Sequence, residues 1–161
     1  MDRAQIGQMA RSKFKEKNNC AESVVKAFIE TGLIDFPEQV SAAATGFGGG
    51  IGKSGHNCGA LTGAVIALGL KKGRISPNES IDKDGLTDLS GKPGVYRAVN
   101  YLPTQFKNLY GTVDCSELVK DFEFDSKERK EYCAKLVQEA AEIAYDVIEN
   151  FEHYACREYD V

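Results

Sequence analysis

Apolar residues recur every three or four positions along most of this chain, and that spacing predicts amphipathic α-helices. The spacing is most regular near the C-terminus, where a helix is predicted over about 126–152 with Cys133 on its apolar stripe, facing the core. Further helices are predicted over 3–17, 20–31, 37–45, 58–71 and 93–109. No pair of strands and no internal repeat is recognisable. The predicted fold is therefore all-α, a compact multi-helix bundle.

Glycine and proline indicate where these helices end, bend or approach a neighbour. Pro103 should kink or interrupt the helix over 93–109. Gly59 and Gly63 lie four residues apart on one helix face, so another backbone should pass close to them. The polar segment 73–92 is a predicted surface excursion. We expect one domain over residues 1–161, with its core over 18–152.

The segment GFGGGIGKSG, residues 46–55, is a predicted glycine-rich loop before the helix that begins near Cys58. Its letters partly resemble phosphate-binding motifs. A P-loop would need glycine where Phe47 stands, and the dinucleotide pattern over 50–55 lacks a strand before it. We interpret the loop as a close backbone approach to a cofactor or a partner helix, with a flexible connector as the plain alternative.

Composition excludes several classes of protein. The chain has 161 residues and a net charge of −4, so it has no basic excess with which to bind nucleic acid. The N-terminal segment has no apolar signal core, and the apolar run over 60–70 is too short to span a membrane. We therefore expect a soluble, cytoplasmic protein. Its five cysteines should be reduced, metal-bound or redox-active there, rather than paired in structural disulfides.

Three of the five cysteines directly follow a residue type that often caps a helix. The pairs are Asn19-Cys20, Asn57-Cys58 and Asp114-Cys115. Glu22 and Glu117 follow the first and third caps by three residues, which predicts capping boxes. A helix start favours the thiolate, so these thiols should have lowered pKa values.

The spacing between the cysteines matches no local metal or redox motif, since the chain contains no CxxC. A shared site would have to be assembled by the fold from separate helices. Cys156, three residues after His153, is interpreted as a packing residue, and His56 as a loop residue. With only two histidines, a histidine-rich metal site is excluded.

The hexapeptide CGALTG, residues 58–63, has one cysteine upstream and two downstream. Together with the glycine loop before it and AVIALGL after it, this pattern resembles the C_GCAxxG_C_C family of redox-active four-cysteine proteins over about 18–150. The family is related to the iron–sulfur domain of split-Soret cytochrome c. The resemblance implies a helical fold, cluster binding and possible homodimers. Its four positions would be Cys20, Cys58, Cys115 and Cys133.

Three hypotheses follow for these four cysteines. In the first they bind an iron–sulfur cluster of the 2Fe–2S type for electron transfer or redox sensing, with backbone amides of Gly49 and Gly50 beside it. In the second the protein is a metal-free thiol–disulfide or sulfur-transfer protein, in which Cys58 attacks as a nucleophile while Cys20 or Cys115 resolves the disulfide. In the third the four thiolates hold a structural zinc ion. Whether the protein is an enzyme, and what its redox partner is, are left open.

Overall fold

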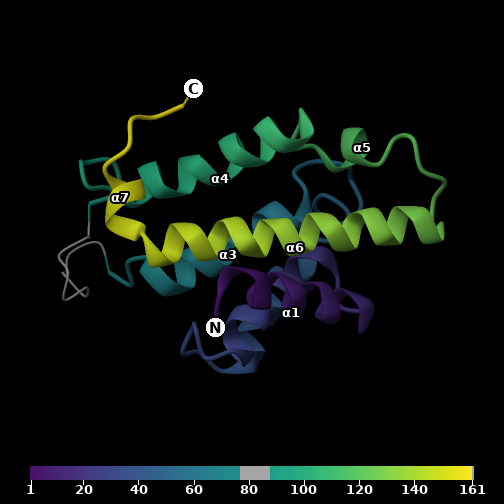
Figure 1. The fold of residues 1–161 in the computed structure, drawn as a ribbon, viewed down its shortest axis with the longest axis horizontal. Coiled ribbons are helices and arrows are strands. Elements are labelled where there is room, and N and C mark those ends of the chain that lie inside the picture. The colour runs from purple at the N-terminus through teal and green to yellow at the C-terminus, as the bar shows by residue number, and fades with distance from the viewer. Residues whose placement is uncertain (77–87, 161) are drawn as a thin grey trace.

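The computed structural model describes residues 1–76 and 88–160, and in this part of the chain the regular elements are all helices, without strands (Figure 1). The prediction of an all-α bundle is confirmed. The helices are α1 (Arg3–Lys15), α2 (Cys20–Glu30), the 3₁₀-helix η1 (Glu38–Phe47), α3 (Gly59–Lys72), α4 (Val95–Tyr110), α5 (Cys115–Leu118), α6 (Lys127–Glu149) and α7 (Phe151–Ala155). None of the described helices is long and apolar enough to cross a membrane.

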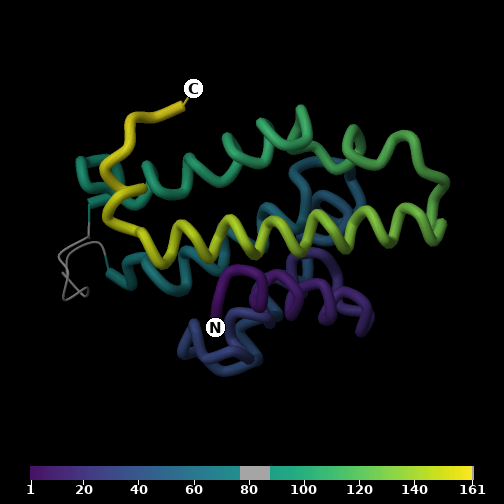
Figure 2. Tube along the Cα trace, viewed as in Figure 1, coloured from purple at the N-terminus to yellow at the C-terminus, as the bar shows by residue number. Residues whose placement is uncertain are grey.

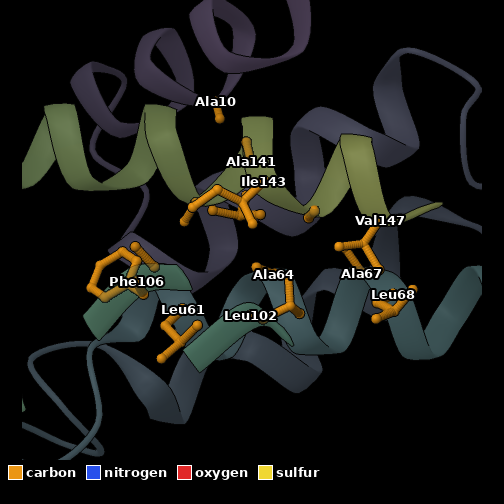
Figure 3. Close-up of a cluster of buried hydrophobic side chains, with 14 of the residues drawn as sticks. Ala10, Leu61, Ala64, Ala67, Leu68, Leu102, Phe106, Ala141, Ile143 and Val147 are labelled. Atoms are coloured by element: carbon orange, nitrogen blue, oxygen red, sulfur yellow. The ribbon is translucent and has the colours of Figure 1, made fainter. Parts of the chain in front are cut away.

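Helix α6 lies at the centre of the bundle, because its apolar residues at spacings of three and four give it more than one buried face (Figure 1). It packs against α1, α2, α3 and α4. Figure 3 shows Val147 of α6 beside Ala67 and Leu68 of α3, and Phe106 of α4 near Leu61 of α3 in the same core. Many contacts in this core are made by alanine, which allows the helices to pack closely.

Three helix boundaries differ from the predictions. Pro103 lies inside α4 without ending it, because Leu102 and Phe106 on either side are buried in the core. Burying such side chains contributes about 1.5–3 kcal/mol each, enough to offset one lost backbone hydrogen bond. The segment after Pro37 is a 3₁₀-helix rather than an α-helix, and proline fits the start of either type. The C-terminal helix breaks at Asn150, which separates α6 from α7.

The predicted close approach at Gly59 and Gly63 is confirmed. A Cβ atom on Gly63 would lie 2.7 Å from the backbone oxygen of Ala21 in α2. A Cβ atom on Gly59 would lie 2.8 Å from the backbone oxygen of Phe47. Helix α3 therefore packs directly on the backbone of α2 and η1. Of the predicted surface excursion over 73–92, residues 77–87 lie outside the described part of the chain.

Candidate functional site

Cys20 is the first residue of α2, and the predicted capping box before it is confirmed. The Asn19 side-chain oxygen accepts hydrogen bonds from the backbone amides of Ala21 and Glu22, each at 3.0 Å. The Glu22 carboxylate accepts one from the Asn19 amide, also at 3.0 Å. The Thr45 hydroxyl donates to the same carboxylate at 2.7 Å. These bonds fix the direction in which Cys20 enters the helix.

Cys58 and Cys115 are held together by their backbones. The Cys58 amide donates to the Val113 carbonyl at 2.8 Å, and the Cys115 amide donates to the His56 carbonyl at 2.7 Å. These bonds flank an isolated antiparallel bridge between Asn57 and Asp114. His56, expected to be only a loop residue, thus positions Cys115 through its carbonyl group.

One of the predicted caps is wrong, and another lacks its predicted capping box. Cys58 is itself the N-cap of α3, which begins at Gly59, so Cys58 is not the first helical residue after Asn57. Asp114 is the N-cap of α5 and Cys115 its first residue, as predicted, but the Asp114 side chain makes no capping bond, and its backbone amide donates to the Thr112 hydroxyl at 3.1 Å. Glu117 forms an ion pair with Lys120 instead of completing a capping box. Both segments are extended because they pair with each other.

The glycine loop, residues 46–55, wraps around this bridge, as Figure 2 shows where the loop passes beside the segment before α5. Its residues 49–53 all have φ values between 59° and 70°. This left-handed run includes Ile51, a β-branched residue that rarely adopts it. A Cβ atom on Gly50 would lie 2.7 Å from Cβ of Cys115, so only glycine fits there. The loop therefore lies directly against the segment that contains Cys115.

Cys20 and Cys58 are neighbours through α2 and α3. A Cβ atom on Gly59, the residue after Cys58, would lie 3.1 Å from Cβ of Cys20. The backbone amide of Gly49 also faces the Cys20 sulfur, where it opposes part of the burial effect on the thiol pKa. Of the two predicted cofactor-binding glycines, Gly49 thus reaches Cys20 and Gly50 reaches Cys115.

Cys133 joins the other three from the second turn of α6. It is half-buried and packs against the core, as predicted. A negative charge on Cys20 or on Cys115 raises the pKa of Cys133, and the same two charges raise the pKa of Cys58. The structure therefore brings the four cysteines within electrostatic reach of one another. Among residues 1–76 and 88–160, however, no three His, Cys, Asp or Glu side chains are grouped closely enough to hold a single metal ion.

Burial, not the helix ends, sets the pKa values of these thiols. It raises the pKa of Cys58 and of Cys133 to about 12, and it raises the pKa of Cys20 and of Cys115 as well. The amides of Ala60 and Leu61 face the Cys58 sulfur but offset only part of this increase. The prediction of lowered pKa values is therefore wrong for these thiols.

The sequence analysis overlooked three side chains beside the cysteines. The half-buried Arg129 lies one helical turn before Cys133, and its guanidinium faces that thiol and lowers the pKa of Cys133 in part. Arg129 also stacks on the exposed Phe124, 5.0 Å from the ring centroid. Tyr110 donates a hydrogen bond to Glu139 near Cys58. Arg129 lies four residues before Cys133 on one predicted helix, and this spacing could have indicated that the two side chains are neighbours. Tyr110 and Glu139 meet only through tertiary packing, so no local pattern indicates their contact.

Cys156 lies apart from this site. It is exposed at the end of α7, in the same short segment as His153. None of the charge interactions of the four coupled thiols involves Cys156. The structure therefore separates the cysteines into a coupled set of four and one surface residue.

Comparison with known proteins agrees with this division. The model of a family described as "Putative redox-active protein (C_GCAxxG_C_C)" matches residues 18–147, a span that contains the four coupled cysteines and leaves out Cys156. An uncharacterized protein of Archaeoglobus fulgidus is 31% identical over 128 residues, which cover 80% of this chain and 83% of the relative. No solved structure matches the chain. This chain belongs to the C_GCAxxG_C_C family of redox-active proteins.

Proposed function

We propose that the protein is a redox protein that binds an iron–sulfur cluster of the 2Fe–2S type through Cys20, Cys58, Cys115 and Cys133. The observation that supports this most is the electrostatic coupling of four thiols from four separate elements around one glycine loop. Four cysteine thiolates are the usual ligands of such a cluster, which accepts and releases one electron when bound.

The donor groups suit this cofactor. Beside the thiols lie a backbone amide of the glycine loop at Cys20 and the Arg129 guanidinium at Cys133. Amide donors and positive charge near cluster sulfurs stabilise the more negative, reduced state, so these groups would raise the reduction potential. Electron transfer or redox sensing are the functions that follow from such a centre.

The spacing of the thiols bears on the choice between a cluster and a single zinc ion. Structural zinc needs four ligand atoms at about 2.0–2.3 Å from one point. No three candidate ligands in the described residues are grouped in that way. A binuclear cluster needs less convergence, because each of its two irons takes two of the four thiolates. The absence of such a group from this part of the chain counts against structural zinc.

The metal-free alternative, in which Cys58 attacks a disulfide, finds less support. A nucleophilic cysteine needs an accessible thiolate. Only 4% of Cys58 is exposed, and burial raises its pKa to about 12. At neutral pH such a thiol is protonated and shielded.

Anaerobic reconstitution with ferrous iron and sulfide tests the proposal. We expect about two irons and two sulfides per chain, with visible absorption bands and an EPR signal after one-electron reduction. Serine at any of the four coupled positions should reduce iron uptake or change the spectrum. Cys156→Ser is the matched control, and it should load as the wild type does.

Three outcomes would overturn the proposal. The first is a fully reduced wild-type protein that takes up no iron. The second is binding of one zinc ion per chain without binding of iron, which would indicate a structural site. A reversible disulfide involving Cys58 in metal-free protein, without iron uptake, would indicate thiol–disulfide chemistry.

A further inference from the structure

A cavity of about 470 Å³ lies between the end of α1 and the first turns of α6, on the right in Figure 1. This size falls within the range of small-molecule sites, about 300–1,000 Å³. Its apolar lining residues are Phe14 and Ala134, of which Ala134 is only 1% exposed. Its edge bears four lysines, Lys15, Lys17, Lys127 and Lys130. We call these six residues the lysine-rimmed cavity.

The rim has an excess of positive charge. Lys130 forms an ion pair with Asp125 at 2.8 Å, and Glu131, the acidic residue at the cavity, pairs with Arg11. Within the described part of the chain, no ion pair joins Lys15, Lys17 or Lys127 to a carboxylate. Three cations thus converge on one hollow in a protein whose net charge is −4. Such a reversal of local charge attracts anions to this face.

The chemistry of the cavity points to an anion with a hydrocarbon part. The lysine rim is exposed to solvent, whereas Ala134 is only 1% exposed and Phe14 is packed against the core. Asn18 is the amide side chain that lines the cavity, and its NH₂ group already donates to the Lys13 carbonyl at 2.9 Å. Few directional donors are left to recognise a sugar or a base, so charge and apolar contact would provide the affinity.

A second hollow is larger, but its lining charges do not favour one class of ligand. It measures about 870 Å³ and lies between α4 and the C-terminal tail. Its lining includes one lysine, Lys107, and one aspartate, Asp160. These charges balance, so that hollow selects no particular ligand class.

We infer that the lysine-rimmed cavity is a binding site for a small amphipathic carboxylate, of the class of medium-chain fatty acids. The carboxylate would lie among Lys15, Lys17 and Lys127, and the alkyl chain would cover Phe14 at the position where Ala134 is buried. The site adjoins the cysteines in sequence, since Asn18 precedes Cys20 by two residues and Ala134 follows Cys133. Binding does not depend on a cluster, so the inference stands apart from the proposed redox function.

Titration of ¹⁵N-labelled full-length protein with octanoate at pH 7, under reducing conditions, tests the inference by NMR. We expect saturable shifts that are largest for amides of residues 14–18 and 127–134. Acetate lacks the alkyl chain and 1-octanol lacks the charge, so neither should reproduce these shifts at the same concentration.

Two double variants distinguish octanoate binding at the cavity from non-specific attraction of octanoate to surface lysines. Lys17→Gln with Lys127→Gln should weaken octanoate binding about tenfold, as expected for two exposed charge contacts of moderate strength. Lys71→Gln with Lys107→Gln removes the same charge elsewhere and should leave binding within about twofold of the wild type.

The inference would be overturned by the absence of saturable shifts up to about 10 mM octanoate, a concentration that corresponds to negligible affinity. Equal weakening in both double variants would also overturn it. So would binding of an acidic peptide such as oligoglutamate at this face without binding of octanoate, because the surface would then serve a protein partner.

Discussion

Replacement of Gly50 by alanine should destabilise the protein far more than the same change at Gly52, two residues along the same loop. Both glycines have left-handed backbones, with φ values of 70° and 59°. An alanine in this conformation costs about 1–2 kcal/mol. The two sites differ in the space around the new methyl group.

At Gly52 a Cβ atom would meet nothing within 4 Å, so backbone strain is the only expected cost. At Gly50 it would lie 2.7 Å from both Cβ of Cys115 and the backbone nitrogen of His56. Neither atom belongs to a flexible side-chain end, so the loop or the bridge between residues 57 and 114 must shift. Such overpacking adds about 1–3 kcal/mol. The expected totals are about 1–2 kcal/mol for Gly52→Ala and about 2–5 kcal/mol for Gly50→Ala.

Urea unfolding of the reduced, metal-free variants, followed by circular dichroism, measures this difference in the free energy of unfolding. Iron uptake measured in parallel should fall for Gly50→Ala and stay near the wild-type level for Gly52→Ala, since only the first displaces Cys115. Equal destabilisation of the two variants would refute the packing of the loop against Cys115.

Three further predictions follow. Ile51→Gly should stabilise the protein by about 1 kcal/mol in the same unfolding assay, because it relieves a β-branched residue of a left-handed backbone; a loss of stability would contradict this. Iodoacetamide at pH 7, followed by mass spectrometry, should label the exposed Cys156 first and Cys58 and Cys133 slowly, since both have pKa values raised to about 12; rapid labelling of Cys58 would show the reverse. The metal-free protein should lose stability as pH rises above 9.0, the ordinary pKa of these thiols, by up to about 1.4 kcal/mol per pH unit for each buried thiol. Stability falls with rising pH because the thiol pKa is higher in the folded protein than in the unfolded chain, so between pH 9.0 and about 12 the unfolded chain ionises first. Cys58→Ala should flatten the dependence of the free energy of unfolding on pH, measured by urea unfolding between pH 8 and 11.

The sequence predicted the helices well where local signals determine them. The capping box at Asn19 and the apolar stripe of α6 depend on residues three and four apart, so their patterns are visible in the printed chain. The effect of Pro103 was not predictable in this way, because the helix continues through it on account of burial supplied by other helices.

The four cysteines singled out from the sequence lie within electrostatic reach of one another, but the local chemistry around them was not predictable. Asn57 was predicted to be a helix cap and is not one. It pairs instead with Asp114, 57 residues further along the sequence, and no local pattern predicts that contact. The direction of the thiol pKa shifts depends on burial, which follows from the tertiary fold and not from the local sequence. Close packing at Gly59 was foreseeable from its spacing to Gly63, whereas its nearness to Cys20 required the fold.

The raised pKa values give a physical reason to favour a metal-containing centre at these cysteines. Thiolates buried without a compensating positive charge are costly, which is why the four thiols stay protonated in the metal-free protein. A bound metal supplies that charge and displaces the protons, so the same burial that disables a nucleophile protects a ligand set from solvent. Arg129 provides one further positive charge at Cys133, Cys20 and Cys115. A nucleophilic site would expose its thiol and lower the thiol pKa. Cys58 is instead buried, and its pKa is raised.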